Sequence, residues 1–140
     1  MKLTTKFLRS ILPNNEPENE YCKKVLIIDS DQFVTNRIKS ALQAMENQCI
    51  GVANDFLSAD KMINKDQPHY IIINSVLKGE FNAMQTAKII SLDYDIPFLL
   101  VGSLKNPSFL QTINELNPRG HLLLDYTDKE LEEKLREILV

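Results

Sequence analysis

Residues 69–79 read HYIIINSVLKG, and the fold of the chain can be worked out starting from this stretch. Tyr70 and the three isoleucines after it form an apolar run of strand length, which is typical of a strand buried on both faces. Asn74 ends the run and places a neutral amide where the strand leaves the sheet. The chemistry of this edge of the sheet therefore depends on Asn74 and on the residues that end the neighbouring strands.

Apolar runs of strand length alternate with helical periodicity from residue 23 onward. The five runs are KVLIID, CIGVA, YIIIN, IPFLLVG and GHLLLD. Asn106 followed by Pro107 predicts an N-cap and a first helical position, and Thr127 with Glu130 predicts a capping box. Five strands and five helices in strict alternation predict an α/β fold, a doubly wound parallel sheet with helices on both faces.

The first 22 residues differ in composition from the rest. Residues 1–12, MKLTTKFLRSIL, predict a short basic amphipathic helix, residues 13–22 predict a linker rich in Pro, Asn and Glu, and residues 23–140 form the domain. The helix has Lys2, Lys6 and Arg9 on one side and Leu3, Phe7, Leu8, Ile11 and Leu12 on the other. We expect a tether that binds the domain, a protein partner or an anionic membrane; an isolated helix of about 12 residues could also fray in water.

Composition excludes several classes of function. The chain of 140 residues has 16 cations and 19 anions, a net charge of −3, which argues against nucleic-acid binding. Cys22 and Cys49 lack the spacing of a metal or redox pair, so we expect two reduced thiols. There is neither an apolar run of about 20 residues that could span a membrane nor a secretory signal, and we expect a cytoplasmic protein.

Four motifs carry a resemblance to a known family: VLIIDSD, YIIINSVL, IPFLLVGS and GHLLLD. In these, apolar strands end at the positions where receiver domains of bacterial two-component response regulators carry their chemistry. Residues 24–139 resemble such a receiver, of the chemotaxis-regulator-like type. The resemblance implies a flavodoxin-like sheet with strand order 2-1-3-4-5.

The phosphorylation site that the resemblance implies is degenerate in this sequence. Position by position, the phosphoacceptor falls on Asn74, the acidic pair that holds Mg²⁺ on Asp29 and Ser30, the hydroxyl on Gly102 and the lysine on Leu124. An amide cannot form an acyl phosphate, because the nucleophile of that reaction is a carboxylate oxygen, and a single close carboxylate holds Mg²⁺ weakly. We therefore predict a pseudo-receiver that has no catalytic residue, is not an enzyme and binds no metal or cofactor.

Structural roles are open to the same polar residues. Asp31 fits an N-cap of the first domain helix as well as a weak metal ligand. Asn74 and Ser75 could hydrogen-bond the loops around the crevice. His121 stands where receivers commonly carry an aromatic switch residue, and it could sense pH or simply be a half-exposed strand residue.

We predict a stand-alone signalling or scaffold protein that acts by binding another protein, independently of phosphorylation. Because the chain ends with its last receiver helix, we expect no attached output domain. The resemblance implies a partner surface over the fourth domain helix, the fifth strand and the last helix, and a homodimer through it stays open. The candidate surface residues are Phe109, Leu110, Glu115, His121, Lys129, Glu133 and Arg136, and the candidate tether residues are Lys2, Lys6, Phe7, Arg9 and Ile11.

Two other functions compete with this prediction. One is phosphotransfer through a substitute acceptor, which would be Asp29, Asp31, Ser75 or a deamidated Asn74. The other is binding of a small molecule or anion in the vacated crevice. Phosphorylation assays and ligand screens distinguish these functions from protein binding.

Overall fold

The computed structural model describes residues 22–77 and 81–139. The predicted N-terminal helix and all but the last residue of the predicted linker lie outside the described residues. The boundary at residue 23 therefore stays a prediction, although the first strand begins at Lys24, next to it.

The described residues form one parallel sheet of five strands. The strands are β1 (Lys24–Ile28), β2 (Gln48–Ala53), β3 (Tyr70–Asn74), β4 (Phe98–Gly102) and β5 (Gly120–Leu123). Their order across the sheet is β2-β1-β3-β4-β5, and every pair is parallel. The flavodoxin-like order that the sequence predicted is confirmed.

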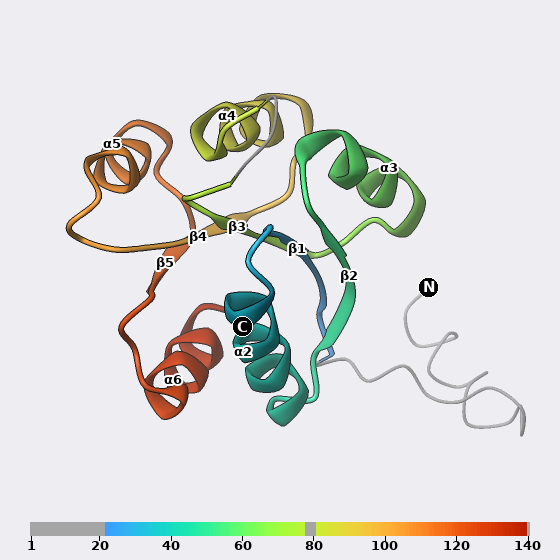
Figure 1. Ribbon diagram of the computed structural model, residues 1–140. Coiled ribbons are helices and arrows are strands. Elements are labelled where there is room, and N and C mark those ends of the chain that lie inside the picture. Colours follow the sequence, from blue (N-terminus) through green and yellow to red (C-terminus); the bar gives the residue numbers. More distant parts are fainter. Residues whose placement is uncertain (1–21, 78–80, 140) are drawn as a thin grey trace, which may run out of the picture.

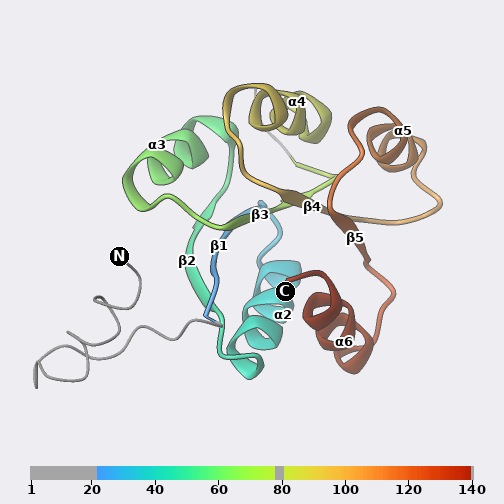
Figure 2. The ribbon, with the colours of Figure 1, turned by 180° about the vertical axis from the view of Figure 1, so that it is seen from behind.

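Five helices in the described part of the chain cover the two faces of the sheet. They are α2 (Gln32–Ala44), α3 (Phe56–Asp66), α4 (Ala83–Asp93), α5 (Pro107–Leu116) and α6 (Asp128–Ile138). Helices α2 and α6 lie side by side on one face, and α3, α4 and α5 lie on the other (Figures 1 and 2). None of the described helices is long and apolar enough to cross a bilayer.

Each face of the sheet has its own core. Val25 and Ile27 of β1 belong to the core under α2 and α6, whereas Leu26 and Ile28 belong to the core under α3, α4 and α5. Strands β3 and β4 are buried along their full length, as strands covered on both faces should be. The uninterrupted apolar run of residues 70–74 is therefore the central strand of the sheet.

Helix starts follow the predicted capping residues. Asp31 caps α2 by accepting the backbone N–H groups of Phe33 and Val34. Asn106 caps α5 with Pro107 inside its first turn, and Thr127 caps α6 through a capping box. These caps hold the helix N-termini at the carboxyl edge of the sheet, where the crevice lies.

Candidate functional site

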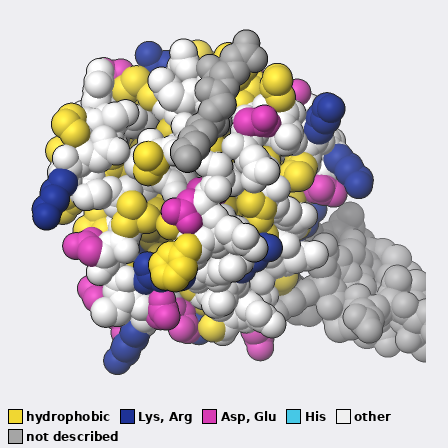
Figure 3. All heavy atoms as spheres, viewed as in Figure 1, with side chains coloured by type: hydrophobic (Ala, Val, Ile, Leu, Met, Phe, Trp, Pro, Cys, Tyr) yellow, Lys and Arg dark blue, Asp and Glu magenta, His cyan; other side chains and the backbone are white. Residues whose placement is uncertain are grey.

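The strand-end residues that the sequence singled out lie together at the carboxyl edge of the sheet. Ser30, Asn74 and Leu124 contribute to an open pocket of about 400 Å³. Leu124 donates its backbone N–H to the carbonyl of Gly102 at 2.9 Å, so the two positions that the resemblance aligned with the receiver lysine and hydroxyl are adjacent. Figure 3 looks onto this edge and shows hydrophobic side chains among acidic and basic ones.

The carboxylate of Asp29 is enclosed by three donors of the protein itself. The Nδ2 of Asn74 donates to Asp29 Oδ1 at 3.0 Å, and the backbone N–H of Asp31 donates to the same oxygen at 2.8 Å. The Oγ1 of Thr35 donates to Asp29 Oδ2 at 3.2 Å. The Oδ1 of Asn74 accepts the backbone N–H of Val76 at 3.0 Å. Asn74 therefore links β1 to the loop after β3, as the structural interpretation of this amide predicted.

Burial raises the pKa of Asp29 above its ordinary value of 3.8, and the hydrogen bonds from Asp31, Asn74 and Thr35 oppose this shift. The side chain is only 2 % exposed. Both of its oxygens are already hydrogen-bonded, whereas Mg²⁺ prefers several oxygen ligands at close to octahedral geometry. The oxygen ligands that remain at this site do not fit the Mg²⁺ of a working receiver.

No group of three or more His, Cys, Asp or Glu in residues 22–77 and 81–139 is placed to hold a metal ion. Asp31 uses its Oδ1 to cap α2, and Ser30 is exposed and carries no carboxylate. Asp29, Asp31 and Asn74 all make hydrogen bonds within the protein.

At Gly102, which the resemblance aligned with the receiver hydroxyl, an aromatic ring fills the space that a side chain would need. A Cβ added to Gly102 would lie 2.3 Å from Cδ1 and 2.7 Å from Cγ of Phe109, and 2.5 Å from Oγ of Ser75. Since real Cβ atoms essentially never approach other atoms this closely, no side chain fits at Gly102 while Phe109 keeps its position. His121 contacts the same ring edge to face, with ring centroids 6.0 Å apart.

The burial of Phe109 corrects one prediction. The sequence placed Phe109 on the partner surface, but its side chain is 0 % exposed and belongs to the core under α3, α4 and α5. The apolar face of α5 turns this ring toward the end of β4, where Gly102 leaves room for it. A glycine at the hydroxyl position, followed seven residues later by a large apolar residue, was the signal in the sequence.

Ser75 takes a different role from the one expected. Its Oγ is buried without a hydrogen-bond partner among the described residues, so it does not tie the loops together through its hydroxyl. Its backbone N–H donates to the carbonyl of Val101 at 2.8 Å and continues the pairing of β3 with β4.

The other predicted surface residues are distributed over α5, β5 and α6. Leu110 and Glu115 on α5 are exposed, and His121 on β5 is half-buried, as its structural interpretation predicted. Lys129, Glu133 and Arg136 on α6 are exposed, but Arg136 binds Glu132 and the carbonyl of Ala44 and so faces α2.

Sequence reasoning missed Arg37, which fixes the loop that follows β5. Its guanidinium donates to the carbonyls of Leu124 and Tyr126, and its Nε lies 2.9 Å from Oδ1 of Asp128. This side chain reaches the loop from α2 and binds its backbone carbonyls. Its partners are 87 to 91 residues away, and no local pattern could have indicated them.

The strand order, the helix arrangement and the strand-end crevice define the fold as that of a response-regulator receiver domain. The receiver domain of a modulated diguanylate cyclase from Desulfovibrio desulfuricans G20 is 17% identical, with a TM-score of 0.73, over 84% of this chain and 94% of that one. The RcsB receiver from Salmonella enterica serovar Typhimurium is 19% identical, with a TM-score of 0.74, over 82% and 86%. The receiver of a response regulator, NarL, from Mycobacterium tuberculosis is 20% identical, with a TM-score of 0.70, over 88% and 98%.

A narrower assignment comes from the sequence family. Residues 24–137 match the family described as flagellar regulatory protein FleQ, and the chain belongs to that family. No curated protein matches the chain.

Proposed function

We propose that this chain is a pseudo-receiver that undergoes no phosphoryl transfer and acts by binding a protein partner. The observation that carries the proposal is the amide of Asn74 bound to Asp29 at the position of the phosphoacceptor. Phe109 supports it, because its ring fills the space that a hydroxyl side chain at Gly102 would need. The protein is then a signalling or scaffold component of the cytoplasm, with no catalytic role.

The partner surface we propose includes the exposed residues Leu110 and Glu115 of α5, Lys129 and Glu133 of α6, and the half-buried His121 between them. Residues 1–12, with Lys2, Lys6, Phe7, Arg9 and Ile11, form a second region for binding, joined by residues 13–22 to the domain at 23–140. The family description makes regulators of flagella the first partners to test.

Nuclear magnetic resonance tests the absence of phosphoryl transfer directly. Acetyl phosphate, or beryllofluoride, is added with Mg²⁺ to the ¹⁵N-labelled full chain, and the amides of residues 29–35 and 74–77 are followed. We expect no saturable shift, because no carboxylate replaces the missing acceptor and Asp29 is already hydrogen-bonded. A saturable shift that disappears in Asp29→Asn would support phosphotransfer through a substitute acceptor and overturn the proposal.

An affinity pull-down from the native cell tests the binding role. The full chain is compared with a chain that lacks residues 1–20 and with the full chain carrying Glu133→Lys. A partner lost only on truncation assigns binding to the N-terminal segment, and one lost only with Glu133→Lys assigns it to the surface of α5, β5 and α6. If a purified partner bound only after treatment with acetyl phosphate, the phosphorylation-independent proposal would be wrong.

A second candidate, binding of a small molecule or anion, is favoured by the open pocket of about 400 Å³ at the crevice. Its lining combines polar and apolar side chains and includes one carboxylate: Ser30, Asp31, Gln32, Val34, Asn74, Val76 and Leu124. A thermal-shift screen of nucleotides and inorganic anions tests this function. A saturable rise in Tm that is lost in Asn74→Leu would favour it, and an unchanged Tm across the screen would count against it.

A further inference from the structure

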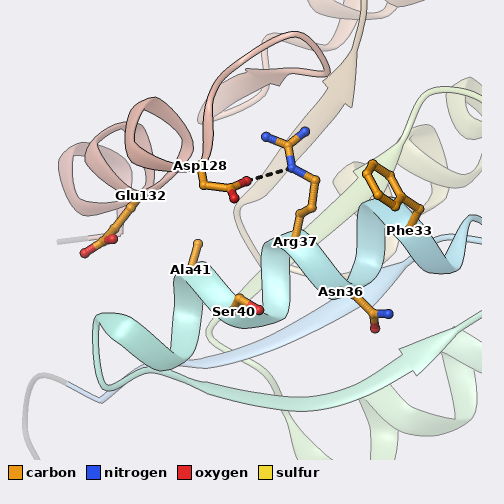
Figure 4. A pocket seen from close by; sticks show the side chains of 7 residues that line it. All are labelled: Phe33, Asn36, Arg37, Ser40, Ala41, Asp128 and Glu132. Atoms are coloured by element: carbon orange, nitrogen blue, oxygen red, sulfur yellow. Dashed lines mark hydrogen bonds and ion pairs between the residues drawn. The ribbon is translucent and has the colours of Figure 1, made fainter.

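The groove between α2 and α6 has a lining that fits a basic amphipathic segment. It is open, with a volume of about 420 Å³, and it is lined from α2 by Phe33, Asn36, Arg37, Ser40 and Ala41 and from α6 by Asp128 and Glu132. Figure 4 shows Arg37 reaching across it to Asp128, with Phe33 toward one end and Ala41 and Glu132 toward the other. Phe33 is 73 % exposed although it lines this groove.

The α6 wall of the groove carries negative charge that further cations can use. The side chain of Asp128 is 87 % exposed, and among the described residues its Oδ1 alone is bound, by Arg37. Glu132 similarly uses only Oε1, which accepts both contacts from Arg136 within the described part of the chain. One oxygen of each carboxylate is therefore available to another cation.

The chain enters the domain at the end of this groove. The backbone N–H of Lys23 donates to Oδ1 of Asn47, just after α2, at 2.9 Å. Arg136, in the last turn of α6, donates to the carbonyl of Ala44, the last residue of α2. The first described residues thus lie where α2 and α6 both end, close to the end of the groove that Ala41 and Glu132 line.

We infer that residues 1–12 of the same chain bind in the groove between α2 and α6. Leu3, Phe7 and the other apolar residues of this segment would cover Phe33 and Ala41, with Lys2, Lys6 or Arg9 placed against Asp128 and Glu132. Residues 13–21 span at most about 30 Å when extended, which exceeds the length of about 20 Å that the 13 residues of α2 occupy.

Intramolecular binding needs little intrinsic affinity. A connection of this length gives an effective concentration on the order of millimolar, so that a helix too weak to bind as a separate peptide can still occupy the groove. The pocket at the other end of the sheet is a poorer site for a cationic segment, because Arg119 and Lys134 line it with Glu137 as its one acidic residue. Binding of residues 1–12 between α2 and α6 does not depend on whether the crevice can be phosphorylated.

Paramagnetic relaxation enhancement in the full chain tests the inference. A nitroxide is attached to Ser10→Cys in a background of Cys22→Ser and Cys49→Ser, and amide intensities are compared with the diamagnetic label. We expect the amides of Asn36, Ser40 and Glu132 to lose several-fold more intensity than that of the exposed Glu115 on α5, at every protein concentration. Broadening that is no stronger on α2 and α6 than on α5 would overturn the inference.

Matched variants assign the binding to the groove itself. Phe33→Ala should reduce the broadening, whereas Leu92→Ala, which removes an 83 % exposed side chain from α4, should not. Glu132→Lys should weaken occupancy by up to about fivefold, the upper range for one exposed ion pair, and Glu115→Lys should leave it unchanged. Broadening of α2 that survives both groove variants would place the segment elsewhere and contradict the inference.

Two mixed samples exclude other occupants. Spin-labelled unenriched chain is added to untagged ¹⁵N-labelled chain, and broadening of Ser40 in that mixture would show that the occupant comes from a second copy. Vesicles with anionic phosphatidylglycerol are added to the labelled chain alone. If the label broadens no groove amide and becomes immobilised on the vesicles, the segment binds the membrane and not the groove. Either result overturns binding within one chain.

Discussion

The contact between Phe109 and Gly102 predicts a large penalty for a single methyl group. In Gly102→Ala the new Cβ would meet Cδ1 and Cγ of the Phe109 ring at 2.3 and 2.7 Å. Rotation of the ring about its Cβ–Cγ bond does not move Cγ, so relief requires a shift of the whole side chain in a fully buried position. Overpacking of this kind costs about 3 kcal/mol, and the lower entropy of the unfolded alanine chain returns about 0.5–1 kcal/mol. We expect a net loss of about 2 kcal/mol in the free energy of unfolding.

Urea unfolding followed by far-ultraviolet circular dichroism measures this loss, because the chain has no tryptophan for fluorescence. The melting temperature should fall by roughly 6–8 °C, at about 3–4 °C per kcal/mol for a domain of this size. Gly51→Ala in β2 is the matched control, since its Cβ would have one close contact, Sδ of the flexible Met62 side chain at 3.1 Å, and would otherwise make ordinary van der Waals contacts. That control should change stability by no more than about 0.5 kcal/mol.

A double-mutant cycle with Phe109→Ala separates the clash from other effects of Gly102. Phe109→Ala alone leaves a cavity and should cost about 3–5 kcal/mol. In that background the new Cβ still meets Oγ of Ser75 at 2.5 Å, but this hydroxyl has no hydrogen-bond partner among the described residues and can rotate away about its Cα–Cβ bond. Gly102→Ala should then be close to neutral, which gives a coupling energy of about 2 kcal/mol with Phe109. If Gly102→Ala were as harmless as Gly51→Ala, or equally harmful with and without the Phe109 ring, the argument that this ring fills the hydroxyl position would be refuted.

Three further predictions follow from the site. Because burial raises the pKa of Asp29, its protonation favours the folded state below pH 3.8, and that contribution is lost as the pH rises through the raised value. The melting temperature of Asp29→Asn minus that of wild type should therefore increase as the pH is raised from below 3.8 to 7. A difference that stays constant with pH would contradict this. Arg37→Ala should lower the free energy of unfolding in urea by about 1–2 kcal/mol through loss of the loop contacts, whereas Lys39→Ala, exposed on the same helix, should change it by less than about 0.5 kcal/mol. Asn74→Asp should gain no acyl phosphate with acetyl phosphate and Mg²⁺, measured by intact mass, and robust labelling of that single variant would show that the rest of the site is more capable than its geometry indicates.

The topology could be predicted because it depends on patterns that are local in sequence. Runs such as YIIIN at 70–74 are buried on both faces, and caps such as Asp31 use only neighbouring backbone groups. Each signal lies within a few residues, so the elements and their alternation can be recognised without knowing which side chains meet. The strand order came from the resemblance to receivers and is confirmed.

For the interior of the site, the sequence predicted only which functional groups of a receiver are missing. The sequence shows that Gly102 has no hydroxyl, but which atom occupies the free space depends on how α5 packs on β4. That packing turns Phe109 inward, against its predicted place on the surface. Arg37 was missed for the same reason, because its partners on the loop after β5 are brought to it by the fold alone.

The losses at the crevice depend on one another, and this bears on whether the site could be restored. The Phe109 ring can lie at the end of β4 only while residue 102 is glycine, so a hydroxyl cannot be added there until the ring is removed. At the other side, an aspartate in place of Asn74 would put a second carboxylate about 3.0 Å from Asp29 Oδ1, where the amide now donates. Two carboxylates at that separation repel unless a cation lies between them or one is protonated. Since Ser30 and Leu124 supply neither a carboxylate nor a cation, a hydroxyl residue at position 102 alone would create a clash, and an aspartate at position 74 alone would create a repulsion.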